Sequence, residues 1–325
     1  MRKEIMVIIE GVSKEIVMLI PMLIAVAYMT LGERKILGGM QRRRGPNKVW
    51  IVGIGQPIAD GLKLMIKEGV KPTRAEGMMY KAGPVVTWML SMLGWSVVPI
   101  GEGKVIVDIE VGIIAWMSIG SLGVYGVIIG GWGSSSQYSI MGGLRSGAQM
   151  VSYELGMGVM MICIIIIAGS GNISRIVEVQ EGVWNISVMM PVVVMYLQVI
   201  LAETNRTPYD LPEAEAELVA GYNVEYGGMG FGMYFLGEYG NIILMSIVTS
   251  VVMMGGWNGK YIGGEIMVGI KSTMIVYMYI WIRGTWCRYR YDQLMRIGWK
   301  EVILYGGGYV IIIGGVLWSI GGVSI

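Results

Sequence analysis

Residues 148–166 read AQMVSYELGMGVMMICIII, and this apolar stretch with one acid decides the class of fold. A helix needs about 20 apolar residues to cross the hydrocarbon core of a bilayer. The stretch therefore predicts a transmembrane helix that carries the carboxyl group of Glu154 inside the membrane. An ionised carboxylate is costly there unless it faces the bundle interior, finds a partner or carries a proton. Arg145 lies just ahead, so an ion pair that fixes helix packing and a proton or ligand site are both open.

The whole chain has the composition of a membrane protein. Apolar residues make up 54% of it and charged residues 15%, whereas about 25% charged is usual for a soluble domain. We expect an all-α, polytopic membrane protein that forms a single domain over residues 1–325, with about eight transmembrane helices. The expected spans are 13–31, 82–100, 111–131, 149–169, 183–201, 233–255, 268–285 and 302–320.

Lysine and arginine are distributed unevenly over the connections between these spans. The odd-numbered connections hold eighteen, eleven of them in the first connection (32–81), and the even-numbered connections hold four. By the positive-inside rule the odd-numbered connections face the cytoplasm or the mitochondrial matrix, with both termini on the opposite face. Amino acids with G-rich codons are abundant, with 51 glycines against 2 phenylalanines. This usage favours a mitochondrial gene, and hence the mitochondrial inner membrane over a bacterial plasma membrane.

The residue types present restrict the chemistry of the chain. It has no histidine, and its two cysteines, Cys163 and Cys287, lie far apart without a CxxC motif. We therefore expect no metal, iron–sulfur or flavin site in this chain. The sequence also has no P-loop and no glycine fingerprint after a soluble strand. Proton chemistry then falls to carboxylates, lysines and tyrosines.

The fifth connection (202–232) is acidic although it belongs to the basic side. Residues 201–226, LAETNRTPYDLPEAEAELVAGYNVEY, hold six carboxylates and one base, Arg206. Asp210 and Glu213 have capping-box spacing, which predicts a short helix with Glu213 and Glu217 on one face. Acids that repel each other in a fixed register are candidates for proton sharing, and a solvated acidic loop is the alternative. Glu238, in the next span, is a second intramembrane acid.

Two further connections have recognisable patterns. In residues 53–69, GIGQPIADGLKLMIKEG, apolar side chains recur at helical spacing from Ile54 to Met65, and Asp60 and Lys63 share the other face. Such a short amphipathic helix lies in the membrane interface, either as the lip of a cavity or as a simple anchor. The seventh connection contains RGTWCRYRYDQLMRIGWK, residues 283–300. Its alternating Arg and Tyr favour a docking surface for a peripheral protein, with a plain basic flank as the alternative.

Five motifs resemble one known family. They are GERK, QPIADGLKL, LRSGAQMVSYE, ETNRTPYDLPEAEAELVAGYNVEY and RYRYDQLMRIGWK. In this order and spacing they resemble subunit 1 of NADH:ubiquinone oxidoreductase (respiratory complex I), from about residue 16 to 318. The resemblance implies a core membrane subunit that forms the membrane part of the quinone cavity and couples quinone reduction to proton translocation. It also implies that five helices repeat half of an antiporter fold.

The resemblance assigns partners and roles. Ubiquinone would be the bound substrate, and peripheral subunits would carry the iron–sulfur clusters and FMN. Antiporter-like and small membrane subunits and membrane lipids would be neighbours, and no nucleic acid is implied. The quinone-cavity positions are Arg34, Asp60, Lys63, Arg145, Phe231, Phe235, Arg290 and Asp292. The proton-relay positions are Glu154, Glu203, Asp210, Glu213, Glu215, Glu217, Glu225 and Glu238.

Two other functions are compatible with the sequence. An equivalent membrane subunit of an ion-translocating hydrogenase-type complex would keep the fold and couple a different redox reaction to ion movement. A stand-alone secondary transporter would use the intramembrane acids without partners. The dense charge and the aromatic residues of the odd-numbered connections disfavour the transporter, because such surfaces are typical of docking.

Overall fold

The computed structural model describes residues 2–210, 221–259 and 263–319. Within these ranges the named elements are all helices and no strand occurs, which confirms the expected fold class. The helices are α1 (Arg2–Met40), α2 (Gln56–Ile66), α3 (Gly77–Gly94), α4 (Gly112–Gly133), α5 (Gln137–Ala168), α6 (Ile173–Val179), α7 (Asn185–Val188), α8 (Met190–Glu203), α10 (Gly228–Met253), α11 (Gly264–Thr285), α12 (Tyr291–Arg296) and α13 (Ile303–Ser319). A 3₁₀ turn lies at Ile51–Gly53, another at Gly221–Asn223, and a π-helical turn at Ile297–Val302 joins α12 to α13.

Several helix boundaries differ from the expected spans. Six of the described helices are long and apolar enough to cross a membrane, and α8 is a shorter apolar helix. The span expected at 149–169 is the second half of α5, which begins twelve residues earlier behind the N-cap Ser136. The span expected at 183–201 is interrupted at Met189, and α8 restarts with Pro191 in its first turn. The helices that match the spans expected at 13–31, 82–100 and 302–320 cover 2–40, 77–94 and 291–319.

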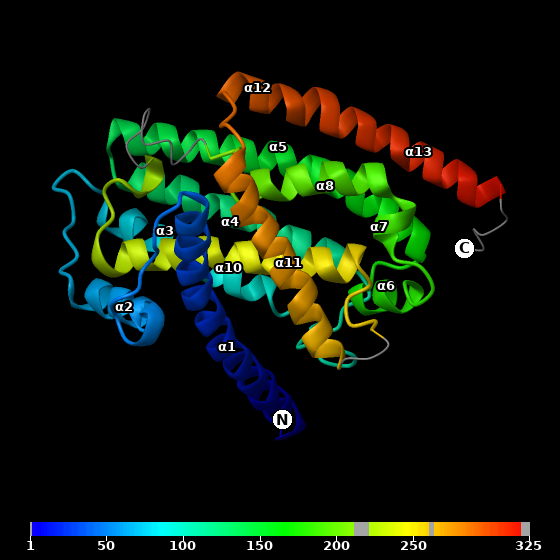
Figure 1. Ribbon diagram of the computed structural model, residues 1–325, viewed down its shortest axis with the longest axis horizontal. Coiled ribbons are helices and arrows are strands. Elements are labelled where there is room, and N and C mark those ends of the chain that lie inside the picture. The colour runs from blue at the N-terminus through cyan, green and yellow to red at the C-terminus, as the bar shows by residue number, and fades with distance from the viewer. Residues whose placement is uncertain (1, 211–220, 260–262, 320–325) are drawn as a thin grey trace.

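Helix α10 is at the centre of the arrangement. It packs against α3, α11, α1, α2 and α6, and in Figure 1 it runs through the middle of the molecule. Helix α5 packs against α4, α8 and α13, and α13 lies along the upper right edge of the view. The N-terminal part of α1 extends away from the other helices toward the lower edge.

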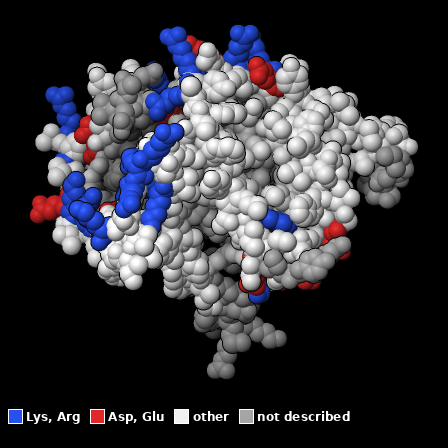
Figure 2. All heavy atoms as spheres, viewed as in Figure 1, with Lys and Arg blue, Asp and Glu red and all other residues white. Residues whose placement is uncertain are grey.

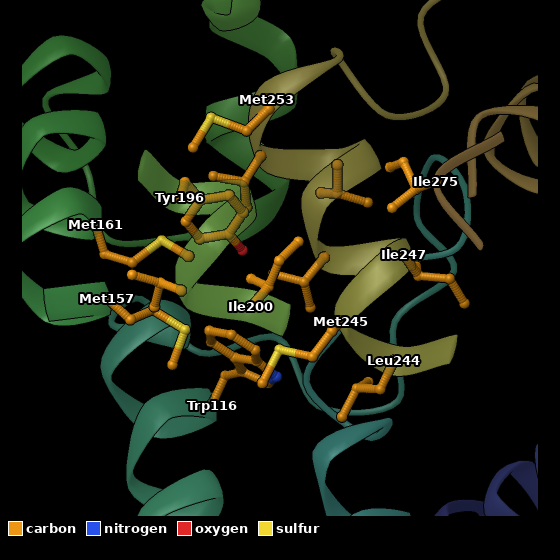
Figure 3. Packing of buried hydrophobic residues seen from close by; sticks show 14 of the residues in the cluster. Trp116, Met157, Met161, Tyr196, Ile200, Leu244, Met245, Ile247, Met253 and Ile275 are labelled. Carbon is orange, nitrogen blue, oxygen red and sulfur yellow. The ribbon is translucent and has the colours of Figure 1, made fainter. Parts of the chain in front are cut away.

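The core between these helices is rich in methionine. Trp116 of α4, Met157 of α5, Ile200 of α8 and Met245 of α10 converge at the centre of Figure 3, and all four are buried. Methionine side chains are unbranched and fill irregular gaps between helices that cross at different angles. Methionine side chains can therefore fill the irregular space beside the interrupted α7–α8 segment.

Helices α3 and α4 approach each other through glycines. A Cβ atom on Gly126 would lie 2.8 Å from the backbone nitrogen of Thr87, and one on Gly133 would lie 2.6 Å from that of Tyr80. Small residues at a helix crossing allow close van der Waals contact, which drives helix association in lipid. The glycine-rich sequence of the expected third span is thus explained by its contact with α3.

The connections alternate between two ends of the bundle, as expected. At one end, Glu76 N–H donates to Gly133 O at 3.1 Å, the Tyr80 hydroxyl donates to Glu225 O at 2.8 Å, and Tyr289 N–H donates to Pro208 O at 3.1 Å. These bonds join the first, third, fifth and seventh connections. Figure 2 shows many Lys and Arg side chains gathered around α2 and near the start of α12. At the other end, Asn172 donates to Asp108 at 2.8 Å, which joins the fourth connection to the second.

The other end of α10 is held by a fully bonded polar network. The Lys271 ammonium donates to Met254 O at 2.7 Å and to Gly256 O at 2.8 Å, and it lies 4.6 Å from the Trp184 ring centre. The Gln180 amide oxygen accepts from Gly255 N–H at 3.0 Å. A cation at the C-terminus of a helix satisfies carbonyl groups that have no partner inside the helix. The network closes this end of the bundle around the end of α10.

We expect Gly126→Ala to lower the free energy of unfolding by about 1–3 kcal/mol, because the added methyl group collides with the Thr87 backbone. Gly120→Ala on the same helix is the matched control, because its methyl group meets open space. Thermal unfolding of the detergent-solubilised protein, followed by tryptophan fluorescence, measures the difference. Equal melting temperatures for the two variants would contradict the proposed close contact.

Candidate functional site

Glu33, near the end of α1, is the centre of a buried ion cluster. Its carboxylate accepts hydrogen bonds from Tyr239 at 2.6 Å, from Arg206 at 3.3 Å, and from Arg283. The Arg206 guanidinium also lies 4.4 Å from the Tyr239 ring centre. Only 5% of Glu33 is exposed, so these donors replace the water around its charge. The cluster joins α1, α10, α11 and the fifth connection at the end where the basic connections meet.

Helix α2 lies beside this cluster, against α1 and α10. Arg34 donates to one oxygen of Asp60 at 2.9 Å, and Gln56 donates to the other oxygen at 3.0 Å. Lys63 is exposed, and the apolar side chains of the stripe point away from the rest of the chain, with Met65 67% exposed. The predicted amphipathic helix is therefore confirmed, and the structure pairs two of its predicted site residues, Arg34 and Asp60.

An aromatic stripe on α10 leads toward Glu33. The Phe231 and Phe235 rings stack with their centres 5.9 Å apart, and the Phe235 and Tyr239 rings are 4.4 Å apart. Residues four apart lie on the same face of a helix, so the three rings form one continuous surface. Leu64 of α2 approaches Gly232 in the same region. The stripe thus runs from the α2 contact to the ion cluster.

The fifth and seventh connections meet on the other side of the cluster. Arg288 donates to Asp210 at 3.5 Å, and the Tyr209 and Tyr289 rings stack with their centres 5.5 Å apart. Gln149 of α5 donates to both Ala202 O and Tyr209 O, at 2.8 and 2.9 Å, which holds the start of the fifth connection. Arg290 and Asp292 lie at the surface at the start of α12.

A cavity of about 80 Å³ lies between the helices, with a mostly apolar wall that carries a few polar groups. Its wall includes Glu203 of α8, Glu238 of α10, Asn205, Asn241 and Tyr222. The Tyr222 hydroxyl donates to the Glu238 carboxylate, whereas one oxygen of Glu203 has no hydrogen-bond partner among the described residues. A water molecule needs about 10–15 Å³ and two or more polar partners, so this cavity can hold several. The structure therefore brings two predicted relay acids to one hydratable space.

Glu154 and Arg145 both belong to α5, and the structure disfavours the ion pair that the sequence left open between them. Nine residues apart on a straight helix, they are separated by about 13 Å along the axis and point to opposite sides. Glu154 instead approaches Ser121 of α4 and lies within electrostatic reach of Glu203. The Arg145 guanidinium lies 5.8 Å from the Tyr291 ring centre. Arg145 was expected in the third connection, which is limited to residues 134–136.

The remaining predicted acids lie in the fifth connection. Glu225 borders a depression of about 350 Å³ between the first and fifth connections, which Lys67, Glu68 and Tyr226 also line. The capping box and the short helix predicted from Asp210 onward fall outside the described residues. So do the predicted relay residues Glu213, Glu215 and Glu217.

Several residues that the structure brings together were not predicted from the sequence. Glu33 lies within the quoted GERK motif, but only Arg34 was selected from it. Arg206 and Arg283 were counted only as bases that set orientation, and Tyr222 and Tyr239 carried no signal. The two arginines are 173 and 250 residues away from Glu33 in the sequence. An acid at the end of a predicted span was the available signal for Glu33.

The described part of the chain holds no group of three or more His, Cys, Asp or Glu residues arranged to bind a metal ion. Cys163 is buried, Cys287 is exposed, and both are free thiols. The groups at the site are therefore carboxylates, guanidinium groups and tyrosine hydroxyls. Such groups bind polar ligands and exchange protons.

Comparison with known proteins matches the chain to a sequence family described as NADH dehydrogenase, over residues 13–314. The NADH-ubiquinone oxidoreductase chain 1 of Chondrus crispus is 47% identical over 313 residues, which are 94% of this chain and 96% of that protein. A subunit of the NADH-quinone oxidoreductase of Rhodospirillum rubrum is 51% identical over 290 residues, 87% of this chain and 86% of that one. The NADH-ubiquinone oxidoreductase chain 1 of Arabidopsis thaliana is 47% identical over 306 residues, with 92% and 94% covered.

We expect Glu33→Gln to destabilise the fold by about 3 kcal/mol or more, because it leaves two guanidinium groups without their charge partner. Asp60→Asn is the matched control, since its pair with Arg34 is partly exposed and contributes about 0–1 kcal/mol. Thermal unfolding in detergent measures both effects. Similar losses of stability in the two variants would show that the buried cluster is no more important than a surface pair.

Proposed function

The chain belongs to the NADH dehydrogenase family, and from this premise we propose that it is the core membrane subunit of a proton-pumping NADH–quinone oxidoreductase. In this proposal it lines the membrane part of the quinone cavity and couples quinone reduction to proton translocation. The names of its relatives support this enzyme over a hydrogenase-type complex and over a stand-alone transporter.

The seam between α1, α2 and α10 is the observation that carries the quinone part of the proposal. The exposed apolar stripe of α2 and the aromatic stripe from Phe231 to Tyr239 suit an isoprenoid tail that comes from the bilayer. Glu33, Arg206 and Arg283 together carry one net positive charge at the end of that stripe. Guanidinium and hydroxyl donors suit the oxygen atoms of a quinone headgroup and the negative charge that develops on reduction.

Reduction of a quinone to a quinol consumes two electrons and two protons. We expect no redox centre in this chain, so the electrons would come from an iron–sulfur cluster in a peripheral subunit, and FMN would lie in another partner. The protons would come from the acidic connection, with Asp210 and the run Glu213, Glu215 and Glu217 as the reservoir. Like-charged neighbours titrate as a coupled set, so a charge change at the headgroup displaces protons along the run.

The proposed relay continues into the bundle through the cavity that Glu203 and Glu238 line. Glu225 lies at the surface depression, Glu238 and Glu203 line the cavity, and Glu154 is within electrostatic reach of Glu203. Waters in the cavity would join the two lining carboxylates, which supports proton exchange between them. From Glu154 the protons, or the charge change, would pass to antiporter-like membrane subunits.

The basic end of the bundle is the proposed docking face. The first and seventh connections present Arg and Lys with exposed aromatic residues such as Trp286, a composition that suits a peripheral protein subunit. We propose that this end faces the mitochondrial matrix, by the positive-inside rule. The relatives come from both eukaryotes and bacteria, and the codon-biased composition favours the mitochondrial inner membrane.

A photoreactive quinone analogue added to the intact complex should label residues of the α1–α2–α10 seam. We expect covalent adducts on peptides that contain Asp60, Phe231, Phe235 or Tyr239, located by mass spectrometry. An excess of unmodified quinone should remove the label. Labels confined to the opposite end, near Gln180 or Lys271, would contradict the proposed cavity.

Glu203→Gln should lower proton translocation coupled to quinone reduction by about tenfold or more, since a positioned proton-transfer group is lost. We expect the same direction for Glu213→Gln and Glu217→Gln. Glu178→Gln is the matched control, because Glu178 is an exposed acid at the opposite end. Pumping is measured in vesicles that contain the assembled complex, with assembly checked by native electrophoresis. Normal quinone reduction and pumping in all three variants would contradict the proposed relay.

A further inference from the structure

We propose that Tyr222 is a positioning residue for Glu238. Its hydroxyl, carried by the fifth connection, holds the Glu238 carboxylate at the cavity wall and links the position of this acid to the acidic connection. This inference rests on the proposed function, in which Glu238 takes part in the relay. It adds a residue for which neither the sequence motifs nor the relatives assign a role.

The contact joins a buried tyrosine to a half-buried acid. Only 2% of Tyr222 is exposed, and its hydroxyl donates to Glu238 of α10. The Tyr234 ring lies edge-on to the Tyr222 ring, with centres 5.3 Å apart and planes at 72°. A large ring packed in this way has little freedom to rotate, so its hydroxyl has a fixed direction. The ring packing therefore holds the donor hydroxyl in a fixed position beside Glu238.

The backbone of Tyr222 is equally fixed. It lies in the 3₁₀ turn Gly221–Asn223, and its carbonyl accepts a hydrogen bond from the Ser139 hydroxyl at 3.1 Å. A Cβ atom on Gly142 of α5 would lie 2.8 Å from the Tyr222 nitrogen, so this turn rests directly on α5. In sequence the turn begins four residues after Glu217. The turn therefore holds the Tyr222 ring in place beside α5.

Few other groups compete for Glu238. The titratable side chains that share its cavity are Tyr222, Tyr234 on α10 and Glu203 on α8. Helices α3, α4 and α5 contribute only uncharged side chains to the described cavity wall. The neighbouring Tyr226 hydroxyl donates to Gly130 O at 3.0 Å, and burial raises its pKa to about 12, so it stays protonated.

The physical consequence is a link between the position of the 3₁₀ turn and that of the carboxylate. A hydrogen bond from a fixed hydroxyl holds the Glu238 carboxylate in one orientation at the cavity wall. In this way the acidic connection positions an acid on α10, the helix that follows it.

The test removes one hydroxyl and keeps the ring. We expect Tyr222→Phe to lower pumping in the assembled complex by about tenfold, the size expected from loss of a hydrogen bond to a charged group. Tyr226→Phe is the matched control, because its hydroxyl bonds to a backbone carbonyl, and we expect a change of less than about twofold. Redox-difference infrared spectra give a second readout. The carboxyl band that responds to quinone reduction should shift in Tyr222→Phe and disappear in Glu238→Gln.

A double variant separates this inference from the relay itself. If Tyr222 acts through Glu238, Tyr222→Phe should add little to the loss caused by Glu238→Gln. Independent, multiplicative losses or an unshifted carboxyl band in Tyr222→Phe would overturn the role of Tyr222, and the relay would stand. Normal pumping in Glu238→Gln would overturn both. If Tyr222→Phe does not assemble, Glu238→Asp tests the same contact, because it keeps the charge and shortens the reach to the hydroxyl.

Discussion

The burial of the Glu33 carboxylate among Arg206, Arg283 and Tyr239 is the constraint on which the rest of the site depends. Each of these charges loses hydration on burial, and only close, well-directed bonds among them offset that loss. The four residues come from α1, the fifth connection, α11 and α10. Their bonds therefore fix where the fifth connection enters the bundle and where α11 ends. The acidic connection begins from this fixed point.

The cluster also explains the length of α1. The span expected at 13–31 would end before Glu33, whereas the helix continues to Met40. Helical geometry carries Glu33 inward and Arg34 outward on adjacent positions, so one helix end supplies both the buried cluster and the Asp60 pair. The two consecutive charges in GERK thus belong to two different environments. The Arg34–Asp60 pair holds the amphipathic helix α2 against α1.

Local sequence patterns predicted the helices well, but they did not predict contacts between residues far apart in the sequence. The stripe from Ile54 to Met65 predicted α2, because the periodic pattern of an amphipathic helix lies within one short stretch of sequence. The span that carries Glu154 was expected to begin at residue 149, twelve residues too late, because polar residues such as Ser139 and Gln149 extend a helix whose polar face is buried against the fifth connection. The Glu33 cluster needs partners 173 and 250 residues away, and a single sequence contains no signal for such pairs.

The two ends of the bundle differ in how their buried polar groups are bonded. At the end near Lys271, the Gln180 side chain bonds four backbone groups, at Ile176, Val251, Asn185 and Gly255. A fully satisfied network is rigid and has no site left for a mobile proton. At the basic end, oxygens of Glu203, Asn205 and Asn223 have no partner among the described residues. Water can satisfy buried acceptors of this kind, which supports the proton exchange that we propose for this end.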